Sequence, residues 1–459
     1  MKLSIADNVH LVEPGDFEPS EHWYPRVLNS NIHPLVSHFL HLTTDQFISR
    51  FSRLHPGADE EKLREVLAYK PKYFQWSGTD MMHITNQAGM RKLTIIETNS
   101  CPSGQKSMPL LDLNIEKGGY KKLLELTFKP QVEKHNETGG LAVIYDKNPM
   151  ENIGYASTLA DAFGEDVYLA KFLKDDPDPP AKFVDNKLYV KSENEEWIPI
   201  RAAFRYVTQE PWNRIPLKSR TLLLNPIEAC LAGGRNKTEA YMAYQKFNDK
   251  FRASGLEIHT PHTYLEVEHK DLFHYFEKLG RSMVIKVPDS NAGQGVYTVT
   301  SQEEMETVYE TLKAYQPEKY LIQQLIYSNY IKGSDKEKAW YHVGTIPDKK
   351  NRSYAFDLRL MMHYTEEGLR PLAIYSRRAR LPLNKPLPEG ASSWDLYGTN
   401  LSVKQTEGWS YDDERLMLYD IRNFGNLGLG IDELIQGFIQ SAMATYAIDQ
   451  HAIEKFDNI

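Results

Sequence analysis

Two charged side chains interrupt the apolar segment SYAFDLRLMMHY, which otherwise has the composition of a buried strand. Side chains alternate between the two faces of a strand, so Asp357 and Arg359 share one face, while the residues that alternate with them are all apolar. A buried structural ion pair is one interpretation of this pattern. The other is a carboxylate that faces a cleft and binds a metal ion.

A second polar pair, Glu97 and Asn99, ends the apolar segment KLTIIETN with the same two-residue spacing. A carboxylate and an amide oxygen that point to one side suit Mg²⁺, which takes hard oxygen ligands. The loop that follows, SCPSGQKS, offers hydroxyls, backbone N–H groups and the ammonium group of Lys106. An ordinary turn after the strand is the alternative interpretation.

The turn NAGQGV, with Gly293 and Gly295, lies between two strand-like segments, MVIKV and VYTV. Glycine lets a backbone approach a phosphate closely, although most such turns are plain hairpins. The spacing matches neither a Walker loop nor a Rossmann fingerprint. Two lysines accompany the turn. Lys286 lies within a strand, where an unpaired lysine would be costly to bury, and Lys237 lies in the first turn of a predicted helix. Solvated lysines are the alternative for each.

Further polar residues lie on three other strand-like segments, two of them after the Asp357 segment and one of them before the Lys237 helix. In RPLAIYSRRARLP, Arg378 and Arg380 share a face, and they could clamp a transferred phosphate or form a solvated basic edge. In GTNLSVK, Asn400 and Lys404 share a face, which could also be a polar sheet surface. Arg205 is a charged residue in the apolar segment IPIRAAFRYV, and a surface strand is its simplest interpretation.

The elements that must position these residues can be outlined from periodicity. The chain to about Lys92 has a mostly helical pattern, and strands and helices alternate from Leu141 to about Pro216. A helix begins after the N-cap Asn236, with Glu239 completing a capping box. It opens a helix–strand–loop–strand–helix–strand unit. Three strand-like segments and a final helix from about 432 to 448 end the pattern.

Composition limits the classes of function. The chain has 459 residues, 54 basic and 62 acidic, and a formal net charge of −8, which disfavours a nucleic-acid binder. Its two cysteines exclude a disulfide framework, and we find neither a signal peptide nor an apolar stretch of about 18–20 residues that would span a membrane. We therefore expect a cytoplasmic protein that binds neither nucleic acid nor membrane.

Taken in order, these segments resemble the ATP-grasp superfamily of carboxylate–amine ligases. Lys237 opens a helix and Lys286 lies in a "VIKP"-like strand before a Gly-rich lid, as in the ATP-binding subdomain of that family. The Asp357 strand is similar to the "FDxR" strand, and TNLSVK to the "TNxSxxK" segment, of tubulin-tyrosine-ligase-like enzymes. The family usually carries E-x-N on its last core strand. Here it appears early, at Glu97, which resembles the circular permutation of eukaryotic-type glutathione synthetases.

The resemblance implies an α/β (α+β) protein with the ATP-grasp fold, in which two α+β subdomains grip ATP after a small α/β domain. The implied regions are an N-terminal region with the E-x-N strand and substrate loop (1–135), a pre-ATP-grasp domain (136–230), an ATP-binding subdomain (231–330) and a core, metal-binding subdomain (331–459).

The resemblance also implies a role for each residue singled out above. Magnesium would be held by Glu97, Asn99, Asp357 and Asn400. ATP would be bound by Lys237, Lys286, Asn291, Gly293, Gln294, Gly295, Lys404 and an adenine hinge of Gln323, Gln324, Leu325 and Ile326. Arg359, Arg378 or Arg380 would stabilise negative charge in the reaction. The acid or amine substrate would be bound by Ser100, Ser103, Gly104, Gln105, Lys106, Ser107 and Arg205.

The expected activity is ATP- and Mg²⁺-dependent amide bond formation, with an acyl phosphate intermediate and small-molecule substrates such as amino acids or peptides. A homodimer is compatible with this reading. A kinase on the same fold, an enzyme that modifies protein tails and a non-enzymatic nucleotide-binding module stay open as alternatives. The sequence does not identify the acid or the amine.

Overall fold

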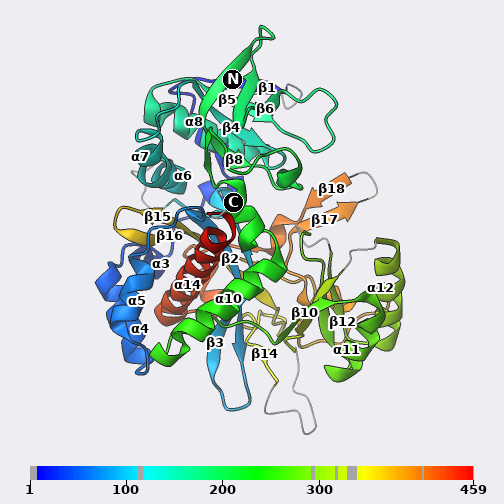
Figure 1. Ribbon diagram of the computed structural model, residues 1–459. Helices are drawn as coiled ribbons and strands as arrows, with labels where there is room; N and C mark the ends of the chain where they lie inside the picture. The colour runs from blue at the N-terminus through cyan, green and yellow to red at the C-terminus, as the bar shows by residue number, and fades with distance from the viewer. Residues whose placement is uncertain are drawn as a thin grey trace.

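The computed structural model describes residues 8–110, 117–290, 295–315, 319–327, 339–405 and 408–457, without the side chains of 315 and 402–411. Three sheets of seven, six and four strands, and a separate two-stranded hairpin, form the scaffold. The seven-stranded unit lies at the top of Figure 1, and the four-stranded unit lies at the lower right with α11 and α12 on it. The predicted mixed α/β class is confirmed.

The six-stranded sheet is antiparallel throughout, and its strands come from both ends of the chain. In the order β14-β2-β15-β16-β19, with β3 paired to β2, they are β14 (Tyr341–His342), β2 (Trp76–Thr85), β15 (Phe356–Thr365), β16 (Gly368–Arg378), β19 (Leu416–Met417) and β3 (Arg91–Asn99). The Glu97 strand and the Asp357 strand therefore belong to one sheet, separated by β2. Strand β2 corrects the mostly helical prediction for this part of the chain. Both of its faces are buried, so its sequence lacks the alternation of a half-exposed strand.

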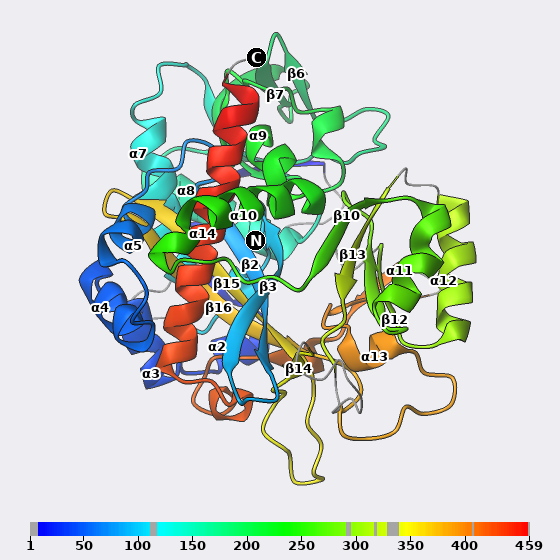
Figure 2. The ribbon, with the colours of Figure 1, turned by 60° about the horizontal axis from the view of Figure 1, so that its bottom comes forward.

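One face of this sheet is apolar and is covered by α14 (Ile431–Phe456), the predicted final helix, which continues to residue 456. At Gly437 a Cβ atom would lie 3.0 Å from Leu93 Cδ1 and 3.4 Å from the methyl carbon of Met81, so glycine allows the helix to lie close to the sheet. Figure 2 shows α14 crossing the strands with α10 beside it. Helices α3 (Pro34–Leu40), α4 (Thr44–Leu54), α5 (Glu60–Leu67) and α10 (Lys237–Phe251) complete this layer.

The seven-stranded sheet has a parallel centre, in which β5, β4, β8 and β9 run in the same direction. Its strands are β1 (Val9–Val12), β4 (Gly140–Tyr145), β5 (Val167–Lys171), β6 (Ala181–Val184), β7 (Lys187–Lys191), β8 (Trp197–Tyr206) and β9 (Leu222–Leu224). Helix α8 (Pro149–Phe163) connects β4 to β5 and packs on both. The α/β alternation predicted for this region is confirmed.

The four-stranded sheet has the order β10-β13-β11-β12 and is antiparallel. Its strands are β10 (Thr263–Val267), β13 (Tyr320–Gln324), β11 (Met283–Lys286) and β12 (Val296–Val299), and its helices are α11 (Leu272–Lys278) and α12 (Gln302–Tyr315). The predicted N-cap of α10 is present, since the Glu239 N–H donates to Asn236 Oδ1 at 3.0 Å. The capping box is not completed, because the Glu239 carboxylate pairs with His451 and Lys455 instead.

The remaining helices and strands are short: α1 (Pro19–His22), α2 (Pro25–Leu28), α6 (Gly118–Leu123), α7 (Lys129–Val132), α9 (Ile227–Ala229), α13 (Ser393–Tyr397), β17 (Ser402–Gln405) and β18 (Gly408–Tyr411). None of the helices in the described part of the chain combines the length and the hydrophobicity that crossing a bilayer requires.

Candidate active site

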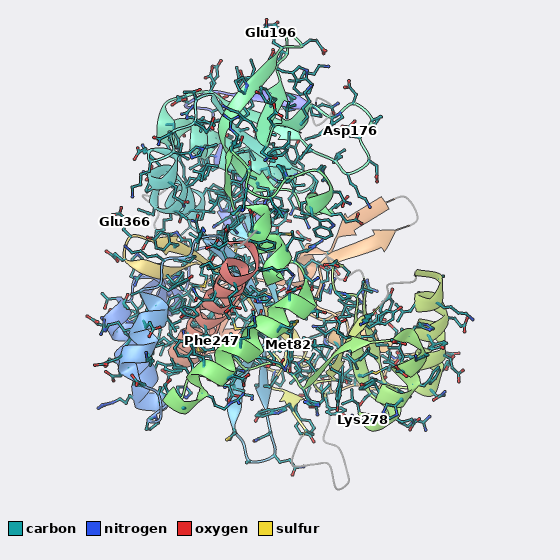
Figure 3. The ribbon with its side chains drawn as sticks, viewed as in Figure 1. Met82, Asp176, Glu196, Phe247, Lys278 and Glu366 are labelled. Carbon is teal, nitrogen blue, oxygen red and sulfur yellow. The ribbon has the colours of Figure 1, made fainter. Side chains whose placement is uncertain are left out.

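All three large sheets contribute to one cleft. Met82, labelled near the middle of the molecule in Figure 3, is one of its lining residues, whereas Asp176 and Glu196 lie at loop tips of the seven-stranded unit. Although the whole chain has a net charge of −8, the described lining includes eight cationic side chains and only three carboxylates. The cations are Lys106, Lys147, Arg205, Arg235, Lys237, Lys286, Arg359 and Arg377, and the carboxylates are Asp80, Glu97 and Asp357. Such a cleft concentrates positive potential and attracts polyanions.

The floor of the cleft is one face of the six-stranded sheet. Asp80 on β2 lies directly opposite Glu97 on β3 and Arg359 on β15. Asp357, two residues from Arg359 along β15, lies directly opposite Arg377 on β16. Directly opposed residues share a face, so strand pairing brings these five side chains to one surface although they are far apart in the sequence.

The carboxylates and guanidinium groups on this floor form a buried network. Arg359 donates to both oxygens of Asp80 at 2.6 Å, and Arg377 donates to Asp80 at 2.9 Å and to both oxygens of Asp357. The Thr399 hydroxyl donates to Asp357 at 2.8 Å. Burial alone would favour the neutral forms, but the paired charges outweigh it: they lower the pKa of Asp80 and raise that of Arg359. These groups are therefore ionised.

Arg377, rather than Arg378 or Arg380, is the arginine of β16 that lines the cleft. Arg378 lies over the Tyr354 ring, with its guanidinium carbon 4.5 Å from the ring centroid. The Arg380 side chain is 52% exposed and pairs with Asp395 at 3.2 Å. Of the predicted arginines, Arg359 therefore lines the cleft, whereas Arg378 and Arg380 do not. The pairing of Asp357 with Arg377, which the sequence does not reveal, decides which face of β16 is turned to the cleft.

Both predicted lysines line the cleft, Lys286 from the four-stranded sheet and Lys237 from the start of α10. Lys286 on β11 donates to the Ile96 carbonyl at 2.9 Å, and burial lowers its pKa to about 8. Lys237 at the start of α10 donates to the Ser290 carbonyl at 2.6 Å and lies 3.4 Å from Glu97 Oε1. Burial lowers the Lys237 pKa as well.

Lys237 holds the start of the predicted lid turn. Asn291, Gly293 and Gln294 lie outside the described residues. Gly295, where the description resumes, has a φ of +66°, which favours glycine, and its carbonyl accepts from the Val287 N–H at 2.7 Å.

The cleft lining includes oxygen donors suitable for Mg²⁺. Glu97, Asn99, Asp357 and Asn400 all line the cleft, and the buried Asn99 Nδ2 has no hydrogen-bond partner among the described residues. No three His, Cys, Asp or Glu residues of the described chain lie close enough together to hold a metal ion by themselves. Mg²⁺ is commonly held by one or two carboxylates together with substrate phosphates, so this donor set fits it.

The loop after β3 lies on the cleft side of the sheet and is anchored by Glu151 of α8. This fully buried carboxylate accepts from the Ser103 hydroxyl at 2.8 Å and from the N–H groups of Gly104 and Gln105 at 2.9 Å each. From the sheet, Tyr375 and Arg359 donate to the Ser103 carbonyl at 2.8 and 3.2 Å.

These anchors fix which loop residues face the cleft. Of the six predicted substrate-binding residues in the loop, Ser100, Ser103, Lys106 and Ser107 line the cleft, whereas Gly104 and Gln105 do not. The Gln105 side chain lies against Gly119 instead.

The predicted adenine hinge forms the apolar end of the cleft. Gln323, Gln324, Leu325 and Ile326 all line it. The Gln323 amide donates to Thr263 at 2.9 Å, and the Gln324 N–H donates to the His262 carbonyl at 2.9 Å. The other described apolar side chains at this end include Val284, Val296, Trp394 and Tyr397. Lys404 lies on β17, and its side chain is outside the described part of the structure.

Arg205 is fully buried at the other end of the cleft, not on a surface strand. It donates to the carbonyls of Asn225 at 2.6 Å and Val207 at 2.8 Å, while Nη2 has no partner among the described residues. Sequence analysis missed its neighbours Lys147 and Arg235, and also Asp80. Asp80 could have been found by reading β2 as a strand, but no local signal distinguishes Lys147 or Arg235.

Comparison with family models and with curated proteins gives no match. Among the solved structures that match is a glutathione synthetase-like effector from Globodera pallida, with 9% identity, coverage of 76% of this chain and 86% of that chain, and a TM-score of 0.40. D-alanyl-alanine synthetase A from Vibrio cholerae O1 biovar eltor matches with 12% identity, coverage of 52% of this chain and 89% of that chain, and a TM-score of 0.32. A RimK domain ATP-grasp protein from Sphaerobacter thermophilus matches with 13% identity, coverage of 65% of this chain and 98% of that chain, and a TM-score of 0.28. An ATP-grasp protein is thus among the matches. All three likenesses are distant.

Proposed function

We propose that this protein is an ATP- and Mg²⁺-dependent ligase of the ATP-grasp kind, which activates a carboxylate and joins it to an amine. One observation carries the proposal. Lys237 lies 3.4 Å from Glu97, and Lys286 lines the same strongly cationic cleft as Glu97, Asn99 and Asp357. Cations for phosphate and oxygen donors for a metal ion are thus brought together from helix α10, the four-stranded sheet and the six-stranded sheet.

The cleft has a place for each part of the nucleotide. The apolar end at Leu325 and Ile326 suits a planar heterocycle beside hinge backbone groups. Lys237 and Lys286 would bind the phosphates. Magnesium would be held by Glu97, Asn99 and Asp357, and it supplies charge neutralisation for the β- and γ-phosphates.

In the proposed reaction, an oxygen of the substrate carboxylate attacks the γ-phosphorus and the bond to ADP breaks, which gives an acyl phosphate. The amine nitrogen then attacks the acyl carbon, and phosphate leaves from the tetrahedral intermediate. Arg359 and Arg377 supply fixed positive charge for both steps, because Asp80 and Asp357 hold their guanidinium planes in place. Ser103 and Lys106 of the anchored loop would orient the acid.

A trapping experiment tests the proposal. The protein is incubated with ATP, Mg²⁺ and pooled carboxylic acids, amino acids and peptides, with hydroxylamine in parallel samples, and ADP is measured. Hydroxamate formation that depends on one pool is the expected result, since hydroxylamine captures acyl phosphates. ADP together with a stable phosphoester and no hydroxamate would show a kinase instead. Failure to bind an ATP analogue with Mg²⁺ would overturn the nucleotide assignment itself.

A further inference from the structure

Three cationic residues cluster at the end of the cleft opposite the adenine hinge: Lys147, Arg205 and Arg235. Lys147 follows β4, Arg205 lies at the end of β8, and Arg235 follows the segment after β9. These three strands are parallel neighbours, so their carboxyl ends meet at one edge. From β4 the chain continues to β5 on one side of the β4–β8 pair, and from β8 it continues to β9 on the other side. Open α/β sheets bind ligands at such a topological switch point, at the carboxyl ends of the strands.

None of the three cations has an anionic partner among the described residues. Arg205 has two carbonyl acceptors and an unpartnered Nη2. No hydrogen bond or ion pair of the described chain engages the Lys147 ammonium or the Arg235 guanidinium, and Arg235 Nε is buried. Burial lowers the pKa of both, that of Lys147 to about 8, and the charge of Arg235 contributes to the Lys147 shift. The two groups therefore lie within electrostatic reach of each other.

Nearby acidic groups do not neutralise this cluster. Asp146 accepts from the N–H groups of Thr208 and Gln209 at 2.6 Å each, lies 3.7 Å from Arg214, and does not line the cleft. Burial raises the pKa of the lining thiol of Cys101 to about 11, so this group is neutral. Glu97 also acts on Arg235, but it lies 3.4 Å from Lys237. Among the described residues, these acidic groups therefore compensate the positive charge at this end only in part.

Arg205 is fully buried, and Lys147 and Arg235 are partly buried. Charges removed from water in proteins are normally paired, because the cost of desolvation is large. In the proposed function, Lys286 and Lys237, which lies two residues beyond Arg235, account for the nucleotide phosphates. We infer that the acid substrate carries a second anionic group, a carboxylate or a phosphate besides the carboxylate that reacts, and that Lys147, Arg205 and Arg235 bind it. This inference rests on the proposed function and narrows its substrate to dianionic acids, such as acidic amino acids and peptides with a free terminal carboxylate.

The test compares matched pairs of probes that differ in one anionic group: L-glutamate with L-glutamine, succinate with succinamate, γ-glutamylglycine with its amide, and O-phosphoserine with serine. Binding is measured by thermal shift and calorimetry in the presence of Mg²⁺ and a non-hydrolysable ATP analogue. We expect at least one anionic member to bind more tightly than its neutral partner. The pair that shows the preference separates a carboxylate from a phosphate.

Lys147→Met and Arg235→Gln are the test variants, and Lys182→Met on β6, outside the cleft, is the matched control. Each test variant should reduce the preference for the anionic member about ten-fold or more, as expected for loss of one charge-assisted contact, and leave affinity for the ATP analogue within about two-fold. If circular dichroism shows that Lys147→Met does not fold, the loss of preference in Arg235→Gln alone tests the inference.

Two results would overturn the inference: equal binding of all paired probes by the wild-type protein, or an unchanged preference in a folded test variant. Failure of the proposed function has a different signature, since the ATP analogue itself would then not bind. Because no described residue forms an ion pair with Lys147, Lys147→Met should also leave the melting temperature of the ligand-free protein unchanged or raise it. A marked fall would show a structural role and would overturn the assignment.

Discussion

At the scale of single residues, Asp357 pairs with Arg377, and in the proposed function it also binds the metal ion. We predict that Asp357→Asn lowers turnover by about a hundred-fold or more, the size of effect expected when a preorganised charge is removed from a reaction centre. The amide keeps the shape and can still accept from Thr399, so the loss of unfolding free energy should be only about 1–3 kcal/mol. ADP release and urea unfolding measure the two effects. Asp432→Asn, which breaks the exposed pair with Arg50, is the control; turnover of Asp357→Asn equal to it would exclude the metal role.

Arg377 and Arg378 form a natural matched pair, since they are adjacent but lie on opposite faces of β16. We predict that Arg377→Lys reduces turnover by about ten-fold or more, because lysine cannot span Asp80 and Asp357 with a planar fork. Arg378→Lys should change turnover by less than about two-fold. Steady-state kinetics on both variants decides the matter. A larger loss of turnover in Arg378→Lys than in Arg377→Lys would instead support Arg378 as the residue that stabilises negative charge in the reaction.

At the scale of elements, the substrate loop depends on α8. We predict that Glu151→Gln raises the KM for the acid while nucleotide affinity stays within about two-fold. The amide oxygen can still accept from Gly104 and Gln105, but the amide NH2 group cannot accept from the Ser103 hydroxyl, so only the loop loses an anchor. Calorimetry with the ATP analogue and kinetics with the acid separate the two. Glu165→Gln, just beyond α8 and paired with Arg201 at the surface, is the control. Equal loss of nucleotide affinity and of acid affinity would indicate general unfolding rather than loop positioning.

Elements with a local signal were predictable, and those defined by distant pairing were not. The capped helix α10 and the continuous apolar strands β4, β11 and β15 follow from neighbours in the sequence. Strand β2 does not, because both faces are buried and Gly78 and Asp80 resemble turn residues. For the same reason, the sequence predicts only part of the candidate site. Local patterns indicate Glu97, Asp357, Lys237 and Lys286, whereas Asp80 and Arg377 reach the cleft only because β2 and β16 pair with β15.

At the scale of the whole molecule, the cleft between the three sheets holds cations, such as Lys147, for which the described residues offer no ion pair. Folding thus leaves an electrostatic cost, which binding of a polyanion would remove. Loss of charge on Lys147 or Lys286 should therefore lower ligand affinity and raise the stability of the ligand-free protein. A pH titration can show this, because burial lowers the pKa of both Lys147 and Lys286 to about 8.

The expected signs follow from proton linkage. In the unfolded chain these lysines titrate near 10.5, so above about pH 8 the unfolded state binds more protons than the folded state. Stability of the ligand-free protein contributed by these groups therefore rises between about pH 8 and pH 10. Affinity for the ATP analogue should fall over the same range, because Lys286 loses the charge that binds phosphate. Thermal shift with and without the analogue, from pH 7 to pH 9.5, measures both. Lys286→Met should flatten the affinity dependence and reduce the stability dependence, to which Lys147 still contributes. If it leaves the affinity profile unchanged, Lys286 is not a phosphate ligand.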